Sequence, residues 1–249
     1  NTTGSYNTGI GYNNLTSNTT GQSNTAVGFE ALKDNVDGAS NTAVGVYSLF
    51  ENTGSYNTAV GRDALKDNTT ASGNTALGYI ALENNTTGAT NTAVGQEALQ
   101  KNTTASYNVA VGYQALEENT TGASNTAVGT FSLDANTTGD YNTGVGYGSL
   151  SANTTANNNT AVGYLALQFT TTGAANTAVG VSALKDNTTG ANNVAVGENA
   201  LANCTTASEN TALGQNALLT STTASDNVAI GHDAMRLATT GGNNVGIGV

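Results

Sequence analysis

The chain has 249 residues, among them 43 Thr, 36 Asn and 31 Gly, with no Pro, no Trp and a single Cys. Only 9% of the residues are charged, which is low for a disordered chain. The net charge of −11 argues against binding to nucleic acid or to an anionic membrane surface. One Cys excludes an internal disulfide framework.

An Asn recurs along the whole chain from Asn7 to Asn244, with thirteen spacings of 17 residues and one of 16. We number the positions of each copy from this Asn. The consensus of the copies reads N-T-A-V-G-x-x-A-L-x-x-N-T-T-G/A-x-x. Position 5 is always Gly, position 4 is always aliphatic and position 3 is always Ala or Gly, whereas positions 6, 7, 10 and 11 vary freely. Because every copy samples the same environment, the constant positions indicate packing.

Positions 2 to 4 are short and β-branched, which predicts a strand whose side chains alternate between two faces. Thr and Val would share one face and Ala the other. Both faces vary little among the copies, so we expect the strand to be buried on both sides, with Val128 inside and Gln114 outside. The Ala face would then contact either the return arm of the same coil or the backbone of another chain.

The segment that follows the strand is ambiguous. Gly28, Ala31, Leu32 and Asn35 have the i, i+3, i+4, i+7 spacing of one helical face. A segment this short is marginal as a helix in water. A short helical turn and a second strand with a bend both fit, and the N-T-T-G/A segment would then turn the chain back.

Stacked copies predict an all-β fold, a parallel β-solenoid of about 14 coils that forms one continuous repeat domain over residues 1–249. Its coils would be less regular over residues 170–249. Equivalent Asn side chains would align into hydrogen-bonded ladders, one at position 1 and one at position 12. The second ladder fails at Thr170, resumes at Asn187 and ends with Cys204. Its unbroken part comprises Asn18, Asn35, Asn52, Asn68, Asn85, Asn102, Asn119, Asn136 and Asn153.

Two segments resemble known surface proteins. The N-V-A-V-G of residues 193–197 and the N-V-A-I-G of residues 227–231 are similar to the N-S-V-A-I-G repeats of trimeric autotransporter adhesin heads. The N-V-G-I-G of residues 244–248 resembles a stretch that precedes the chaperone domain of phage tail fibres. The resemblance implies a parallel homotrimer of β-rolls in an extracellular fibre, on a cell surface or a virion. The period of 17 is longer than that of adhesin heads.

Few residues suggest chemistry. His232 is the only His and lies at a variable position beside Asp233, where a solvated surface role is expected. Cys204 replaces a ladder Asn, which indicates a buried inert thiol. No constant position is Asp, as calcium-binding repeats require. We therefore expect no enzymatic activity, no catalytic residue, no metal site and no cofactor.

Charged side chains concentrate at the four variable positions, which hold 19 of the 23 charged residues and so predict a solvated face. The same positions carry aromatic residues that stack on sugars, anchor a protein partner or pack over the surface. The candidate contact residues are Tyr12, Tyr79, Tyr113, Tyr147 and Tyr164.

These observations favour the stiff shaft of a fibrous surface protein, either an adhesin or a phage-type tail fibre. The expected partners are further copies of the chain in a homotrimer, with Ala26, Ala43 and Ala59 packed between copies, and a surface glycan or protein receptor. Nucleic acid and direct membrane insertion are not expected. The chain starts and stops within a repeat, so we expect it to be a piece of a longer protein.

The alternative function is an ice-binding β-solenoid, because arrays of Thr on a flat strand face order water. The paired Thr residues of positions 13 and 14 argue against it, since adjacent residues of a strand point in opposite directions.

Overall fold

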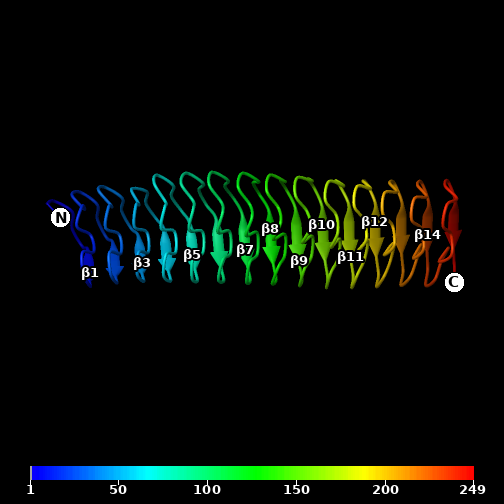
Figure 1. Cartoon of the computed structure of the whole chain (residues 1–249), viewed down its shortest axis with the longest axis horizontal. Helices are drawn as coiled ribbons and strands as arrows, with labels where there is room; N and C mark the ends of the chain where they lie inside the picture. Colours follow the sequence, from blue (N-terminus) through cyan, green and yellow to red (C-terminus); the bar gives the residue numbers. More distant parts are fainter. Residues whose placement is uncertain (1) are drawn as a thin grey trace. The chain divides into compact units, whose positions relative to one another are not determined.

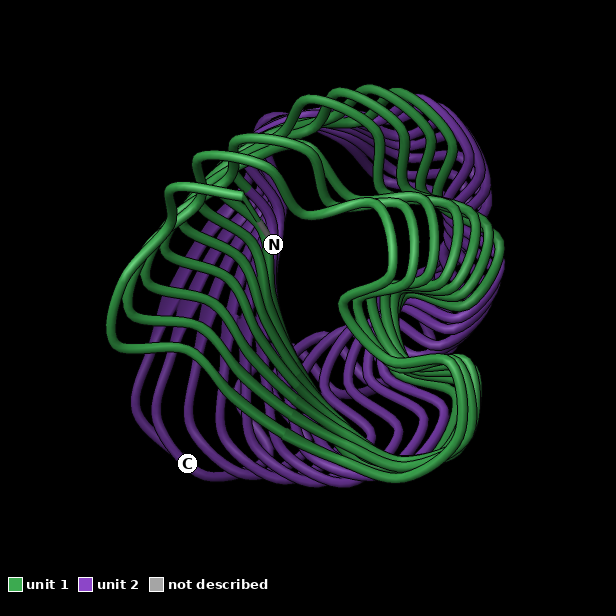
Figure 2. Cartoon of the chain, turned by 90° about the vertical axis from the view of Figure 1, so that its left-hand side faces the viewer, with its two compact units in different colours: residues 1–124 green, residues 125–249 purple. Residues whose placement is uncertain are grey.

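The computed structural model describes residues 2–249 and divides the chain into two compact units, residues 1–124 and 125–249 (Figure 2). Each coil contributes one strand of three residues (Figure 1). Unit 1 contains β1 Thr8–Ile10, β2 Thr25–Val27, β3 Thr42–Val44, β4 Thr58–Val60, β5 Thr75–Leu77, β6 Thr92–Val94 and β7 Val109–Val111. Unit 2 contains β8 Thr126–Val128, β9 Thr143–Val145, β10 Thr160–Val162, β11 Thr177–Val179, β12 Val194–Val196, β13 Thr211–Leu213, β14 Val228–Ile230 and β15 Val245–Ile247.

Within each unit the strands pair in chain order, parallel and with equivalent positions opposite one another. In unit 1, for example, β2 and β3 pair Thr25 with Thr42 and Val27 with Val44. Successive turns of each unit repeat the same outline (Figure 2). The predicted parallel β-solenoid with one strand per 17 residues is therefore confirmed.

The segment after the strand is neither a helical turn nor a second strand. Glu30 and Leu32, at positions 7 and 9, have positive φ values of 53° and 50°. The Glu30 N–H donates to Tyr12 O of the preceding coil at 2.8 Å, and the Leu32 N–H donates to Ser48 O of the following coil at 3.1 Å. A helix would instead bond four residues back. The expected helical turn is thus wrong, and residues 2–249 contain no helix.

The core lies inside each coil, between the Ala of position 3 and the arm that carries positions 8 and 9. Ala26, Ala31 and Leu32 are fully buried. In the coil that has Gly144 at position 3, an added Cβ would lie 3.0 Å from Ser149 Oγ at position 8 of the same coil, which shows how closely strand and arm approach. The return arm of the same chain therefore covers the Ala face.

Two expectations about burial need correction. The Thr and Val side chains of positions 2 and 4 point outward, and Val128 is 37% exposed. The strand is therefore fully buried on one face only. Ala43 and Ala59 are fully buried within the single chain, so the Ala face offers no contact surface to partner chains.

The constant Gly of position 5 has a direct steric explanation. Gly163 has a φ of 139°, a conformation that side chains rarely adopt. A Cβ at Gly163 would lie 2.4 Å from the carbonyl oxygen of Gly180 in the next coil. Each coil is thus stacked on its neighbour at a backbone contact that leaves no room for a side chain.

Candidate binding surfaces

Within each unit, the interior contains a hydrogen-bonded ladder at position 1 that runs from coil to coil. The Asn41 N–H donates to Asn24 Oδ1 of the preceding coil at 2.9 Å. Asn24 Nδ2 donates to Gly38 O of its own coil at 2.8 Å. One Asn side chain therefore binds the next coil and also closes its own.

A second ladder runs beside the first at position 12, as the sequence predicted. Asn35 Nδ2 donates to Asn18 Oδ1 at 2.9 Å and to Gly38 O at 2.9 Å. Gly38 O thus accepts from both ladders. All nine predicted members of the unbroken second ladder are buried. The Asn ladders in the interior are consequently structural. Their N-T-T triplets match the sequence pattern for N-glycosylation, but the Asn side chains are buried and not accessible for glycan attachment.

The second ladder is interrupted at Thr170 in unit 2. Asn187 Nδ2 donates to Thr170 Oγ1 at 3.2 Å, which preserves one contact. However, the buried Oδ1 atoms of Asn153 and Asn187 have no hydrogen-bond partner in the described part of the chain. These are the atoms that an Asn at 170 and an Asn at 204 would bind. The replacement of Asn at positions 170 and 204 therefore leaves two buried acceptors without a partner.

Restoring the ladder is expected to stabilise the protein. In Thr170→Asn the new Nδ2 would donate to Asn153 Oδ1, and a satisfied buried acceptor is worth about 1–2 kcal/mol. The denaturation midpoint should rise, as measured by far-UV circular dichroism in urea. Thr171→Asn, at the adjacent half-buried position, is the control and should give no gain. Equal midpoints for Thr170→Asn and the parent would contradict the ladder geometry.

Cys204 is fully buried, and burial raises the pKa of its thiol from 9.0 to about 11. The neutral thiol is thus favoured by folding. The contribution of the neutral thiol to the free energy of unfolding is fully present below pH 9 and is lost as the pH rises through 11. We expect the free energy of unfolding to fall by about 2–3 kcal/mol more over this range than in Cys204→Ser. Matching pH profiles of the two proteins in urea titrations would contradict the assignment.

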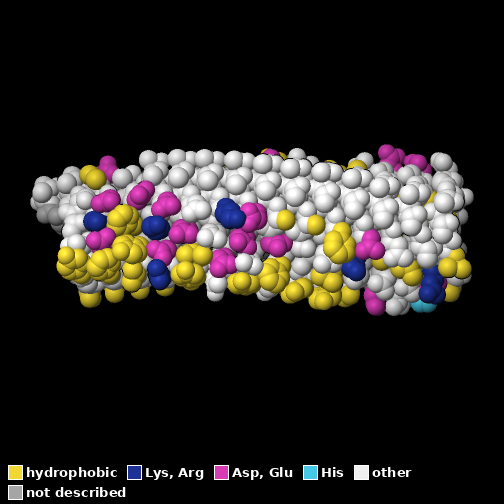
Figure 3. Space-filling model, in the orientation of Figure 1, with side chains coloured by type: hydrophobic (Ala, Val, Ile, Leu, Met, Phe, Trp, Pro, Cys, Tyr) yellow, Lys and Arg dark blue, Asp and Glu magenta, His cyan; other side chains and the backbone are white. Residues whose placement is uncertain are grey.

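The arm surface, defined as positions 6, 7, 10 and 11 of each coil, carries most of the charge. On the face of unit 1 in Figure 3, acidic and basic side chains lie together in a band with hydrophobic side chains along its edge. Lys33 Nζ lies 3.2 Å from Glu30 Oε2, and Arg62 Nε lies 3.0 Å from Asp63 Oδ2. Burial, with the nearby charges of Glu118 and Glu97, raises the pKa of Glu117. The arm surface thus contains ion pairs but keeps an acidic excess.

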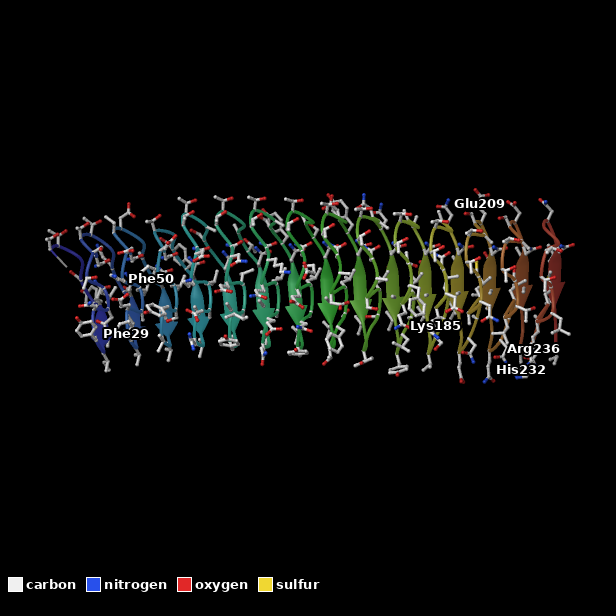
Figure 4. The ribbon with its side chains drawn as sticks, viewed as in Figure 1. Phe29, Phe50, Lys185, Glu209, His232 and Arg236 are labelled. Carbon is white, nitrogen blue, oxygen red and sulfur yellow. The ribbon has the colours of Figure 1, made fainter. Side chains whose placement is uncertain are left out.

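Aromatic rings on the arm surface form one cluster in each unit. In unit 1 the centroids of Tyr12 and Phe29 are 5.4 Å apart and the rings are stacked. The cluster continues through Tyr47 to Phe50, where Lys33 Nζ lies 4.9 Å above the ring. Figure 4 marks Phe29 and Phe50 on the N-terminal coils. One pair in this cluster is therefore stacked, and the other two contacts are edge to face.

In unit 2, Tyr147 stacks on Tyr164 at 5.5 Å and meets Phe131 edge to face. The five predicted contact tyrosines are all exposed, from 39% for Tyr113 to 64% for Tyr12. The sequence interpretation followed position 6 alone and missed Tyr47, Phe50 and Phe131 at positions 7 and 10. Stacking brings these positions together across neighbouring coils.

The outer strand face, defined as positions 2 and 4 of each coil, is the second surface and was assigned to the interior from sequence. It presents Thr or Val at position 2 and an aliphatic side chain at position 4 in every coil. Positions 1 to 5 contain no charged residue. The alternation of side chains between two strand faces was evident from the sequence. The small variation at positions 2 and 4, however, was interpreted as a sign of burial.

Residues that suggest chemistry are scattered. His232 Nδ1 lies 3.6 Å from Asp233 Oδ2, and Arg236 lies 3.7 Å from the same oxygen (Figure 4). Over residues 2–249 no three His, Cys, Asp or Glu side chains are grouped so that they could hold a metal ion. The same residues include no helix of the length and apolar character needed to span a membrane. Neither a protein-family model nor a curated protein matches the chain.

Proposed function

We propose that the chain is a repetitive shaft of an extracellular fibre, on a cell surface or a virion, that presents the arm surface for attachment. The observation that supports this proposal is the separation of constant and variable positions. Ladders of buried Asn join neighbouring coils within each unit, while side chains that differ between coils lie outside. Such an arrangement varies the surface without changing the scaffold.

Assembly of the shaft as a homotrimer is supported by the resemblance to adhesin heads. Because the Ala face is closed within each chain, the copies must meet through an outer surface. The aromatic clusters of the arm surface are the best candidates, since exposed aromatic side chains dominate many protein interfaces. They also suit a protein receptor better than a glycan, because Tyr147 and Tyr164 cover each other's ring faces.

Sedimentation equilibrium at micromolar concentration tests the assembly. A trimer has three times the chain mass of 24.8 kDa. Tyr147→Ser combined with Tyr164→Ser should lower the association constant, whereas Gln96→Ser, also on the arm surface, should not. A folded monomer in the parent protein would exclude the trimer.

A further inference from the structure

The outer strand face presents a β-branched residue, Thr or Val, at position 2 and an aliphatic residue at position 4 in every coil. Position 2 is Thr in eleven of the fifteen strands and Val in the other four. Parallel pairing aligns these positions, as in Thr126 with Thr143 and Val128 with Val145. Neighbouring strands of a sheet are about 4.8 Å apart, so each unit displays two parallel rows of methyl and hydroxyl groups at that interval.

The hydroxyl groups of this face are not used within the protein. In residues 2–249 the Thr side chains of position 2, such as Thr75 and Thr160, form no hydrogen bond with a protein group. The Thr residues of position 13 behave differently, because Thr69 Oγ1 donates to Thr86 O of the next coil at 2.9 Å. The Thr of position 13 is thus a structural feature of the turn.

The chemistry of the face limits what it can bind. A face without charge is complementary to a neutral ligand and unsuited to an ionic one. A dry contact with a second copy would bury hydroxyl groups without partners, which costs free energy. Water satisfies these hydroxyls, and the alternating methyl groups order the water next to them.

We propose that the outer strand face binds ice. Hexagonal ice repeats its surface oxygen atoms in rows at intervals close to the strand spacing of about 4.8 Å. The rows of Thr hydroxyl and Val methyl groups hold a layer of water in register with that lattice. This function is separate from the arm surface and does not depend on trimer assembly.

Thermal hysteresis and ice recrystallisation assays on the full chain test the proposal. We expect activity at concentrations where serum albumin has none. Thr75→Lys combined with Thr160→Lys places one bulky charge on the outer strand face of each unit and should abolish the activity. Gln96→Lys combined with Val181→Lys adds the same charge on the arm surface and should leave it intact.

Both double variants replace side chains that are at least partly exposed, and equal melting temperatures verify their folds. Thr75→Ser with Thr160→Ser is the milder pair, which keeps the hydroxyls, loses two methyl groups and should weaken the activity. The absence of activity in the parent, or its survival in the Thr→Lys pair, would overturn the proposal. Dissociation of a parent oligomer by the Thr→Lys pair would also overturn it, because the face would then be an interface between copies.

Discussion

Replacing Gly163 with Ala is expected to destabilise the protein strongly. The new Cβ would lie 2.4 Å from Gly180 O, and the φ of 139° is strained for any side chain. Backbone strain and overpacking each cost about 1–3 kcal/mol, so we expect a loss of about 2–6 kcal/mol in the free energy of unfolding. Urea denaturation followed by circular dichroism measures it.

The control for Gly163→Ala is Tyr164→Ala in the adjacent residue. Tyr164 is 52% exposed and stacks only on the surface, so its truncation should cost less than about 1 kcal/mol. If the two variants have the same denaturation midpoint, the close backbone contact inferred between these coils would be contradicted.

Replacing Asn85 with Leu, which has the same number of side-chain heavy atoms but no polar group, should cost about 3–5 kcal/mol. Asn85 Nδ2 donates to Asn68 Oδ1 at 2.8 Å and to Gly88 O at 2.9 Å, and Asn85 Oδ1 accepts from Asn102 Nδ2 at 2.8 Å. The substitution leaves Asn68 Oδ1 buried without a donor. Thermal melting by calorimetry should show the loss.

Asn84→Leu is the matched control, because the neighbouring Asn84 is half-buried on the arm surface. It should change stability by less than about 0.5 kcal/mol. A similar loss in both variants would mean that the second ladder does not stabilise the solenoid.

The ladders and the 17-residue coil could be predicted from sequence because each copy samples the same environment at each position. Asn18 through Asn153 recur at intervals of 16 or 17 residues, and stacking lets such aligned amides bind one another. The conformation of the arm could not be predicted. Leu32 is buried with a φ of 50°, whereas the spacing and the helix propensity of Leu both favour a helix. Hydrogen bonds to the coils on either side override that local preference.

The candidate surfaces were only partly predictable. The variable positions identified the arm surface, because a position at which many residue types occur among the copies is expected to be exposed. Thr25 and Val27 were placed in the interior because they vary little, yet they lie on the outer strand face. Their constancy follows from strand pairing and does not require burial. Contacts such as Tyr47 with Phe50 depend on the turn geometry of the arm, which no spacing in the sequence reveals.

Within each unit of the solenoid the coils are equivalent, and each coil is bonded only to its neighbours. Deleting residues 74–90 removes one whole coil and rejoins Gly73 to an equivalent Asn, Asn91. Deleting residues 74–81 instead removes half a coil and misaligns the ladders. Thermal melting by circular dichroism should show a cooperative transition within a few degrees of the parent for the whole-coil deletion, and loss or a large decrease for the half-coil deletion. Equal melting temperatures of the two deletion variants would contradict the equivalence of the coils.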